Sequence, residues 1–302
     1  MPWSVGIRFS HASLQVLAED HAVDLLHIKG PAVDDSLLEA QAGAAAPGEP
    51  VGTVARASID ADVLVRPAHV ARLVVAMHEH GWTTAYRFED GSAFEHAATM
   101  THPFLAPVDV HRRFPGISVD AEAAFERLWA DRHSVFIAGL ECPVPSVTAQ
   151  RLVLIIHAAR GGAGPDNPDI VRSWTDATAE ERAAVRGLAD ELGAEVALAA
   201  GTGRLEEYRG ARGYELWQAL TTGEASLVRM WVARVKSEPT RRAALRTAVR
   251  LALPKPHRLE VTLGRPATAR EIARAYWQRA RRGGREVREL LRHRVSGPWA
   301  GR

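Results

Sequence analysis

Two aspartates, Asp60 and Asp62, stand one residue apart at the start of the apolar run Val63-Leu64-Val65. Alternate residues of a β-strand point to the same face of its sheet, so this segment predicts two neighbouring carboxylates on one face. Carboxylates held that close repel each other unless a cation neutralises them. Hard oxygen ligands favour Mg²⁺ among the divalent cations. The segment therefore predicts a strand that carries a metal site.

A third acid lies in a similar setting, in the alternating stretch Val108-Asp109-Val110-His111. This stretch predicts a second strand with Asp109 and His111 on one face. The imidazole of His111 has two interpretations, a contact with substrate or a structural hydrogen bond beside Asp109.

Length and composition exclude several classes of protein. The 302 residues suffice for two domains, and 46% of them are hydrophobic. No apolar run reaches the roughly 20 residues that cross a membrane, and the N-terminal segment lacks the basic and apolar parts of a secretory signal. The single cysteine, Cys142, excludes an intramolecular disulfide and argues against a thiolate zinc site. We expect a cytoplasmic protein with no membrane partner.

The pattern of apolar residues changes near residue 146. Before it, short alternating runs mix with helical spacing; after it, helical spacing dominates. The fold class expected is α+β, with a mixed sheet and flanking helices at residues 1–145 and a mostly helical domain at residues 146–302. The helices expected are 11–21, 32–44, 67–79, 121–130, 147–160, 179–192, 205–221, 224–236, 240–252, 267–281 and 284–294, the last two separated by Gly283-Gly284.

Charge is distributed unevenly along the chain. The net charge is only +2, yet residues 226–302 hold 20 basic and 5 acidic side chains. Basic helices at the C-terminus suggest contact with something acidic, such as RNA, nucleotide phosphates or the acidic remainder of the chain. The chain is rich in Arg and Ala and poor in Lys, so solvated helix faces in an arginine-rich composition explain the pattern at least as well.

Three segments together resemble a known fold. Ile28-Lys29-Gly30-Pro31-Ala32, the stretch 56–65 that begins with Arg56, and Val108-Asp109-Val110-His111 occur in the order found in the nucleotidyltransferase fold of the DNA polymerase beta superfamily. More narrowly, the chain is similar to a bacterial family of uncharacterised nucleotidyltransferases.

This resemblance implies roles for the residues singled out above. Asp60, Asp62 and Asp109 would bind two Mg²⁺ ions, and Asp109 would also act as, or orient, the base. A nucleoside triphosphate such as ATP would be the co-substrate. Its phosphates would meet the residues that match the family's phosphate-binding positions, which are Lys29, Gly30, Arg56 and Ser58. Lys29 and Arg56 have an alternative interpretation as solvated surface charges.

The function expected from the resemblance is Mg²⁺-dependent transfer of a nucleoside monophosphate to an acceptor hydroxyl, with release of pyrophosphate. The acceptor could be a small molecule, a peptide or protein side chain, or the 3′ end of an RNA such as tRNA. An alternative is a catalytically inactive nucleotide- or RNA-binding protein on the same scaffold. A third is a protein whose basic helices dock an acidic partner.

Overall fold

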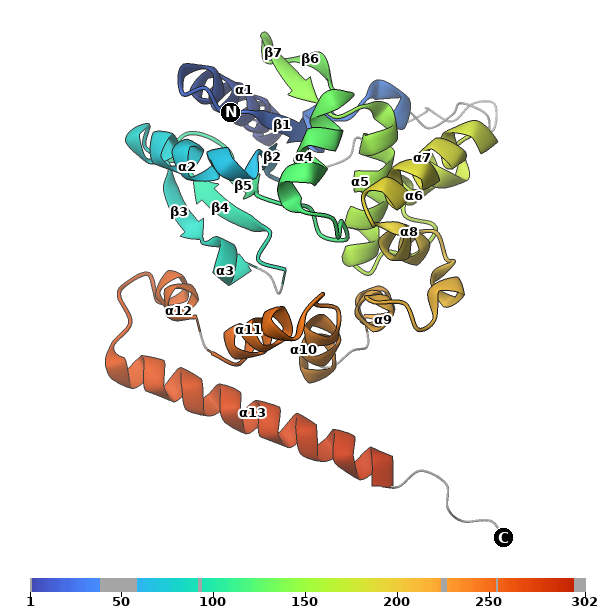
Figure 1. Ribbon diagram of the computed structural model, residues 1–302. Helices are drawn as coiled ribbons and strands as arrows, with labels where there is room; N and C mark the ends of the chain where they lie inside the picture. Colours follow the sequence, from blue (N-terminus) through green and yellow to red (C-terminus); the bar gives the residue numbers. More distant parts are fainter. Residues whose placement is uncertain (1, 39–58, 92–93, 224–226, 254, 296–302) are drawn as a thin grey trace, which may run out of the picture. The chain divides into compact units, whose positions relative to one another are not determined.

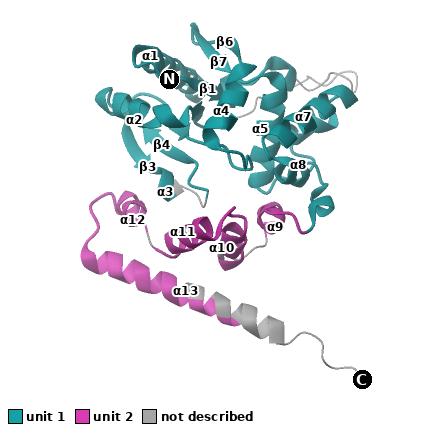
Figure 2. Ribbon diagram, in the orientation of Figure 1, with its two compact units in different colours: residues 1–209 teal, residues 210–302 magenta. Residues whose placement is uncertain are grey.

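The computed structural model describes residues 2–38, 59–91, 94–223, 227–253 and 255–295. The chain divides into two compact units, residues 1–209 and residues 210–302 (Figure 2). The domain boundary predicted between residues 145 and 146 follows the last strand, and the first unit continues beyond it to Arg209. That the catalytic domain ends at residue 145 stays a prediction.

A five-stranded mixed sheet forms the centre of the first unit (Figure 1). The strand order is β1-β2-β5-β4-β3, and only the β2/β5 pair is parallel. Branched apolar residues dominate the central strands β2 and β5, whereas β3 and β4 are built mainly from Thr and Ala. The strands are β1 (Leu25–Ile28), β2 (Ala61–Val65), β3 (Thr83–Tyr86), β4 (Ala97–Thr101) and β5 (Val108–His111).

The two faces of the sheet differ in chemistry. One face presents Val63, Val65, Val108 and Val110 to the main hydrophobic core, which helices α1 (Trp3–Asp20) and α2 (Val70–Glu79) complete. The residues next to those valines, including Asp62 and Asp109, point the other way because successive side chains alternate. One face is therefore an ordinary core and the other is free for polar chemistry.

A separate hairpin pairs β6 (His133–Ile137) with β7 (Leu140–Val144). Cys142 of β7 is fully buried there in a small apolar cluster with Ile137 and Val144. Burial raises the pKa of the Cys142 thiol to about 11, so the thiol stays protonated at neutral pH.

Local sequence signals explain where the helices of the first unit begin. Asp120 caps the start of α4 (Ala121–Ala130), Ser146 that of α5 (Val147–Arg160), and Thr178 and Glu181 form a reciprocal capping box at α7 (Ala179–Glu191). The remaining helices of this unit are α3 (Phe88–Gly91), α4 (Ala121–Ala130), α5 (Val147–Arg160), α6 (Pro168–Ile170), α7 (Ala179–Glu191) and α8 (Glu195–Gly201). Single turns of 3₁₀- or π-helix lie at Gly30–Ala32, Asp35–Leu37, Pro67–His69, Val171–Thr175 and Leu205–Tyr208.

Among its described residues, the regular elements of the second unit are all helices. Its helices are α9 (Tyr214–Thr222), α10 (Leu227–Lys236), α11 (Arg241–Ala252), α12 (Pro256–Leu263) and α13 (Ala269–Val295). The mixed sheet and the helical C-terminal region confirm the predicted α+β class.

Three helix predictions were wrong in detail. The start of the expected helix 32–44 forms two 3₁₀ turns instead, because the side chain of Asp34 accepts a hydrogen bond from Ser36 N and favours a turn; residues 39–44 lie outside the described residues. The helix expected over 205–221 is divided by residues 209–213, where Gly210 and Gly213 have positive φ. The glycine pair at residues 283–284 does not interrupt α13, since good helix formers flank it on both sides.

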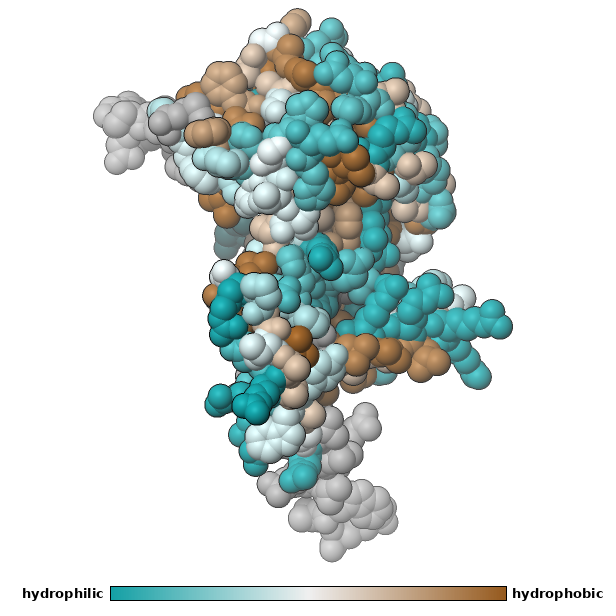
Figure 3. Space-filling model, turned by 90° about the vertical axis from the view of Figure 1, so that its left-hand side faces the viewer, coloured by the Kyte–Doolittle hydropathy of each residue, from teal (hydrophilic) through white to brown (hydrophobic). Residues whose placement is uncertain are grey.

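Among the described residues, no helix is both long and apolar enough to cross a bilayer. On the face drawn in Figure 3, hydrophobic side chains are dispersed among hydrophilic ones. The exposed large apolar side chains Trp3, Phe104, Phe136 and Trp277 come from separate segments of the chain.

Candidate active site

The polar face of the sheet brings acids from two distant segments together. Asp62 of β2 lies opposite Asp109 of β5 in the parallel strand pair, and His111 lies two residues further along β5. One ligand atom from each of these three residues lies within 4.8 Å of the others. The pairing of β2 with β5 thus creates the group of acids that the sequence could only predict as separate motifs.

Asp62 is the most constrained acid of the group. Its side chain is 2% exposed, and its Oδ1 accepts from Lys29 Nζ at 2.6 Å and from His111 Nε2 at 2.8 Å. Burial alone would raise the pKa of the Asp62 carboxyl, but the Lys29 ammonium and His111 outweigh it and hold that pKa well below its usual value. Asp62 is therefore a permanent buried anion.

Lys29 reaches Asp62 from a strained backbone. It follows directly after β1 and has φ 62° and ψ 179°, a conformation found almost only in glycine. Gly30 has φ 52° and opens a 3₁₀ turn with Pro31. Strain of this kind costs about 1–3 kcal/mol and is found preferentially at functional sites. The Lys29-Gly30 turn is positioned to direct a buried ammonium onto the acids.

Asp109 and His111 leave acceptor atoms for a ligand. Asp109 Oδ1 accepts a 2.6 Å hydrogen bond from Thr99 Oγ1 of the neighbouring strand β4, which orients the carboxylate. The Asp62 carboxylate only accepts, so His111 Nε2 is the protonated ring nitrogen. In the neutral tautomer, His111 Nδ1 then carries a lone pair, and this atom is buried with no hydrogen-bond partner among the described residues. Two carboxylates and an imidazole, with one ligand atom of each within 4.8 Å of the others, are ligand types that suit a divalent cation.

Asp60 stands just outside this arrangement. It occupies a bend one residue before β2 and is partly buried. The metal-ligating group found among the described residues comprises Asp62, Asp109 and His111, without Asp60. Two further predicted site residues, Arg56 and Ser58, lie outside the described residues.

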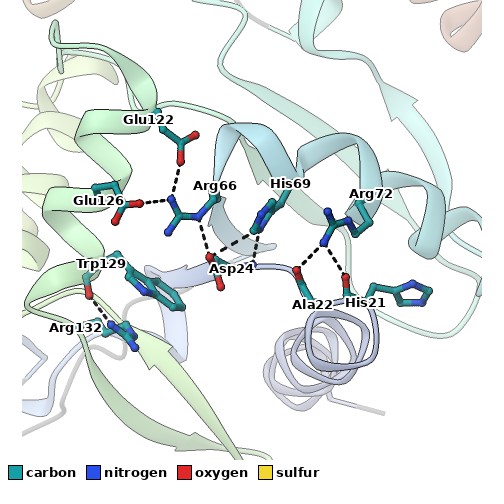
Figure 4. A network of polar contacts seen from close by, with 10 residues as sticks. All are labelled: His21, Ala22, Asp24, Arg66, His69, Arg72, Glu122, Glu126, Trp129 and Arg132. Atoms are coloured by element: carbon teal, nitrogen blue, oxygen red, sulfur yellow. Dashed lines mark hydrogen bonds and ion pairs between the residues drawn. The ribbon is translucent and has the colours of Figure 1, made fainter.

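An ion-pair network fixes the opposite end of β1 and β2. Arg66, which follows β2, donates to Asp24 Oδ2 at 2.8 Å, to Glu122 Oε1 at 2.6 Å and to Glu126 (Figure 4). These hydrogen bonds, the one with Glu126 first, raise the pKa of the Arg66 guanidinium. The network ties α4 to both strands and so stabilises the register that places Asp62 beside Lys29.

Sequence reasoning missed Thr99, His96 and Arg160. Arg160 ends α5 and donates to His96, whose ring centroid lies 5.2 Å from that of His111. An arginine at the end of the apolar stretch Leu152-Val153-Leu154-Ile155-Ile156 is a signal that could have identified it. His157, also on α5, is partly buried and accepts from Arg160 Nη2 at 3.4 Å.

The sheet and its acids define a class of protein: an α+β chain with a candidate divalent-metal site on one face of a mixed sheet. The family described as an uncharacterised nucleotidyltransferase matches residues 51–210, more than half of the chain. The chain belongs to this family, which confirms the predicted relationship. Membership supports nucleotidyl transfer in general terms and implies a nucleoside triphosphate substrate. A comparison with curated proteins finds no match.

Proposed function

We propose that the protein transfers a nucleoside monophosphate from a nucleoside triphosphate, ATP being one candidate, to an acceptor hydroxyl. The observation that carries this proposal is the convergence of Asp62, Asp109 and His111 on one face of the sheet. The chain's membership of the nucleotidyltransferase family supports it. Asp62 and Asp109 would hold Mg²⁺, with Asp60 as a further ligand from the adjoining bend. His111 would offer a ring nitrogen to the metal, or its unpartnered Nδ1 to substrate.

The chemistry requires two bond changes at the α-phosphorus. The acceptor oxygen forms a P–O bond, and the bond from the α-phosphorus to the bridging oxygen breaks, so that its electron pair leaves with pyrophosphate. Bound Mg²⁺ would supply charge neutralisation and lower the pKa of the attacking hydroxyl. Asp109, oriented by Thr99, would accept or direct the hydroxyl proton.

The phosphate contacts belong to the turn after β1. Gly30 allows close approach of backbone to a phosphate, and Lys29 adds a positive charge at the same place. Arg56 and Ser58 remain predicted phosphate contacts. The acceptor remains the open part of the proposal, with a small molecule, a peptide or protein, and an RNA 3′ end as its three classes.

The test combines binding and turnover. Calorimetric titration of four nonhydrolysable ribonucleoside triphosphates, with and without Mg²⁺, should show Mg²⁺-dependent binding of at least one. Asp60→Asn, Asp62→Asn and Asp109→Asn should each abolish Mg²⁺-dependent binding or pyrophosphate release. Asp60→Asn and Asp109→Asn both leave the Lys29–Asp62 ion pair in place, so their effects are separate from loss of that pair.

Asp176→Asn is the matched control, since Asp176 is an exposed aspartate of the same unit. Circular dichroism of each variant separates loss of the site from loss of the fold. Substantial pyrophosphate release by Asp62→Asn and Asp109→Asn would contradict the proposal. Nucleotide binding without pyrophosphate release in any acceptor screen would favour the inactive nucleotide-binding alternative.

A further inference from the structure

Arg160, at the C-terminal end of α5, is held by two histidines. Its guanidinium donates to His96 Nε2 and, at 3.4 Å, to His157 Nδ1. A guanidinium has no acceptor atom, so both of these ring nitrogens must be unprotonated. Burial is the main reason that the pKa of His96 lies far below its usual value, in agreement with a neutral ring. The partners that orient Arg160 therefore leave its charge uncompensated.

No ion pair of the described residues includes Arg160. Arg66 and Arg151 of the same unit both contact glutamate carboxylates, and the partly buried Arg182 donates to backbone carbonyls, whereas Arg160 has neutral imidazoles as its partners. A guanidinium that is partly withdrawn from water loses hydration of its charge, and hydrogen bonds to neutral imidazoles replace that hydration only in part. An anionic ligand would supply the missing partner.

The position of Arg160 indicates which ligand that is. Burial lowers the pKa of its guanidinium, while attraction from Asp62 and Asp109 opposes that effect. Arg160 therefore lies close enough to the acids to interact with them, although it pairs with neither. His96, its main partner, lies beside His111. The cation thus borders the candidate metal site from α5, whereas Lys29 is already bound to Asp62.

We propose that Arg160 binds the phosphate groups of the triphosphate substrate, and that His96 and His157 are positioning residues that orient its guanidinium. The inference rests on the proposed function, because it assigns a ligand to the same site. A guanidinium presents its N–H groups in a planar fork that matches two phosphate oxygens. An orientation set by neutral histidines keeps the fork ordered without neutralising it.

Inorganic tripolyphosphate, titrated without metal, is the direct probe, because it carries the charge of the substrate and no base. The wild-type protein should bind it, and Arg160→Met should weaken binding about ten- to a hundredfold, the effect of losing hydrogen bonds to a charged group. Arg160→Lys should recover only part of the affinity. Arg132→Met, which removes an exposed arginine stacked on Trp129, should bind like wild type.

The role of His96 needs a separate readout. His96→Gln keeps an acceptor for the guanidinium and should retain most of the tripolyphosphate affinity, whereas His96→Ala should lose part of it. In the Arg160→Met background, His96→Ala should have no further effect. An equal loss in both backgrounds would show that His96 does not act through Arg160.

Two outcomes would overturn the inference: no binding of tripolyphosphate by the wild-type protein, or unchanged binding by a folded Arg160→Met variant. The inference and the proposed function fail separately. If Arg160→Met binds Mg²⁺ and nucleotide like wild type while Asp62→Asn does not, the metal site stands and the assignment of Arg160 is wrong. If tripolyphosphate binding requires Arg160 but no nucleotide is ever turned over, the anion site stands and nucleotidyl transfer is wrong.

Discussion

At the scale of single residues, a chain of hydrogen bonds fixes two buried imidazoles. Gln15 Nε2 donates to Glu19 at 2.7 Å, so Gln15 Oε1 is the atom that accepts from His27 Nε2 at 3.0 Å. His27 Nδ1 must then accept from His11 Nδ1, 2.9 Å away. The chain of bonds defines both tautomers and leaves His11 Nε2 as a buried lone pair with no partner among the described residues.

This pair predicts a pH dependence of stability. Burial, partly opposed by Asp62, lowers the pKa of His11 from 6.5 to about 4, and burial also lowers the pKa of His27. Between pH 6.5 and about 4, His11 binds a proton in the unfolded chain but not in the folded chain, so the free energy of unfolding falls as pH falls. For His11 the loss is on the order of 3 kcal/mol by pH 4.

Urea unfolding of wild type and His11→Gln at several pH values between 7.5 and 4 measures this effect. The variant should show a smaller loss of unfolding free energy over the same range. His80→Gln, which replaces an exposed histidine, is the control and should follow wild type. Equal slopes for wild type and His11→Gln would contradict the prediction.

Lys29 combines a buried charge with a strained backbone, and two substitutions separate these contributions. Lys29→Ala and Lys29→Gly both remove the ammonium and leave Asp62 as a buried anion without its cation. The expected loss of stability is about 3–5 kcal/mol for alanine. Glycine tolerates the backbone conformation of this position, so Lys29→Gly should be about 1–3 kcal/mol more stable than Lys29→Ala.

Denaturant unfolding in the presence of EDTA measures the stability lost in Lys29→Ala and the difference in stability between Lys29→Gly and Lys29→Ala. Arg204→Met, which breaks an exposed pair with Glu207, is a control for loss of an ordinary surface charge and should have little effect. If alanine and glycine were equally destabilising at position 29, backbone strain would not contribute there.

At the scale of elements, the close approach of α5 and α8 depends on a glycine. A Cβ at Gly201, the last residue of α8, would lie 2.5 Å from Ile155 Cγ2 and 3.0 Å from Ile155 O. The two helices are in contact, and α5 also carries Arg160 at its C-terminal end. A side chain at position 201 would therefore push on the helix that positions Arg160.

Gly201→Ala should lower the unfolding free energy by about 1–3 kcal/mol, because overpacking forces neighbouring atoms to shift. Gly187→Ala, in the interior of α7, meets no atom within 4 Å and is the matched control. Relief of glycine's conformational entropy should make that control about 0.5–1 kcal/mol more stable. Thermal or urea unfolding of the two variants decides the sign of each change, and a neutral Gly201→Ala would show that α8 can move away from α5.

At the scale of the whole molecule, the two compact units differ in composition and in what they contain. The family match ends at residue 210, next to the division between the units at residues 209 and 210. The sheet, its main core and the described site residues all belong to the first unit, whereas the second unit carries most of the basic residues of the chain.

A fragment of residues 1–209 should therefore fold cooperatively and retain Mg²⁺-dependent nucleotide binding. Calorimetric unfolding and the nucleotide titration described above test this, with the full chain as reference. If the basic helices contact an RNA acceptor, the full chain should bind tRNA with a steep salt dependence that the fragment lacks. Loss of nucleotide binding in a folded fragment would show that the second unit contributes to the site.

The part of the fold that was predictable is the part encoded in local periodicity. The helices at 121–130 and 147–160 match α4 and α5, because caps and apolar spacing mark them within a few residues. The 3₁₀ turns after β1 and the continuity of α13 were not predictable in this way. Each depends on a balance between turn chemistry and helix propensity that local sequence does not resolve.

The sequence by itself determined the α+β class. It also determined that two strands carry the acids, since period-two alternation assigns Asp62 and Asp109 each to one face of its strand. Only the tertiary structure decided that β2 pairs with β5 in the register that sets those acids opposite each other. The tertiary structure also decided that Lys29 and His111 both contact Asp62. It decided as well that Arg160, at the end of α5, interacts with Asp62 and Asp109, which are distant from it in the sequence. The physical reason is that strand register and helix docking depend on burial summed over the whole core, which no local pattern records.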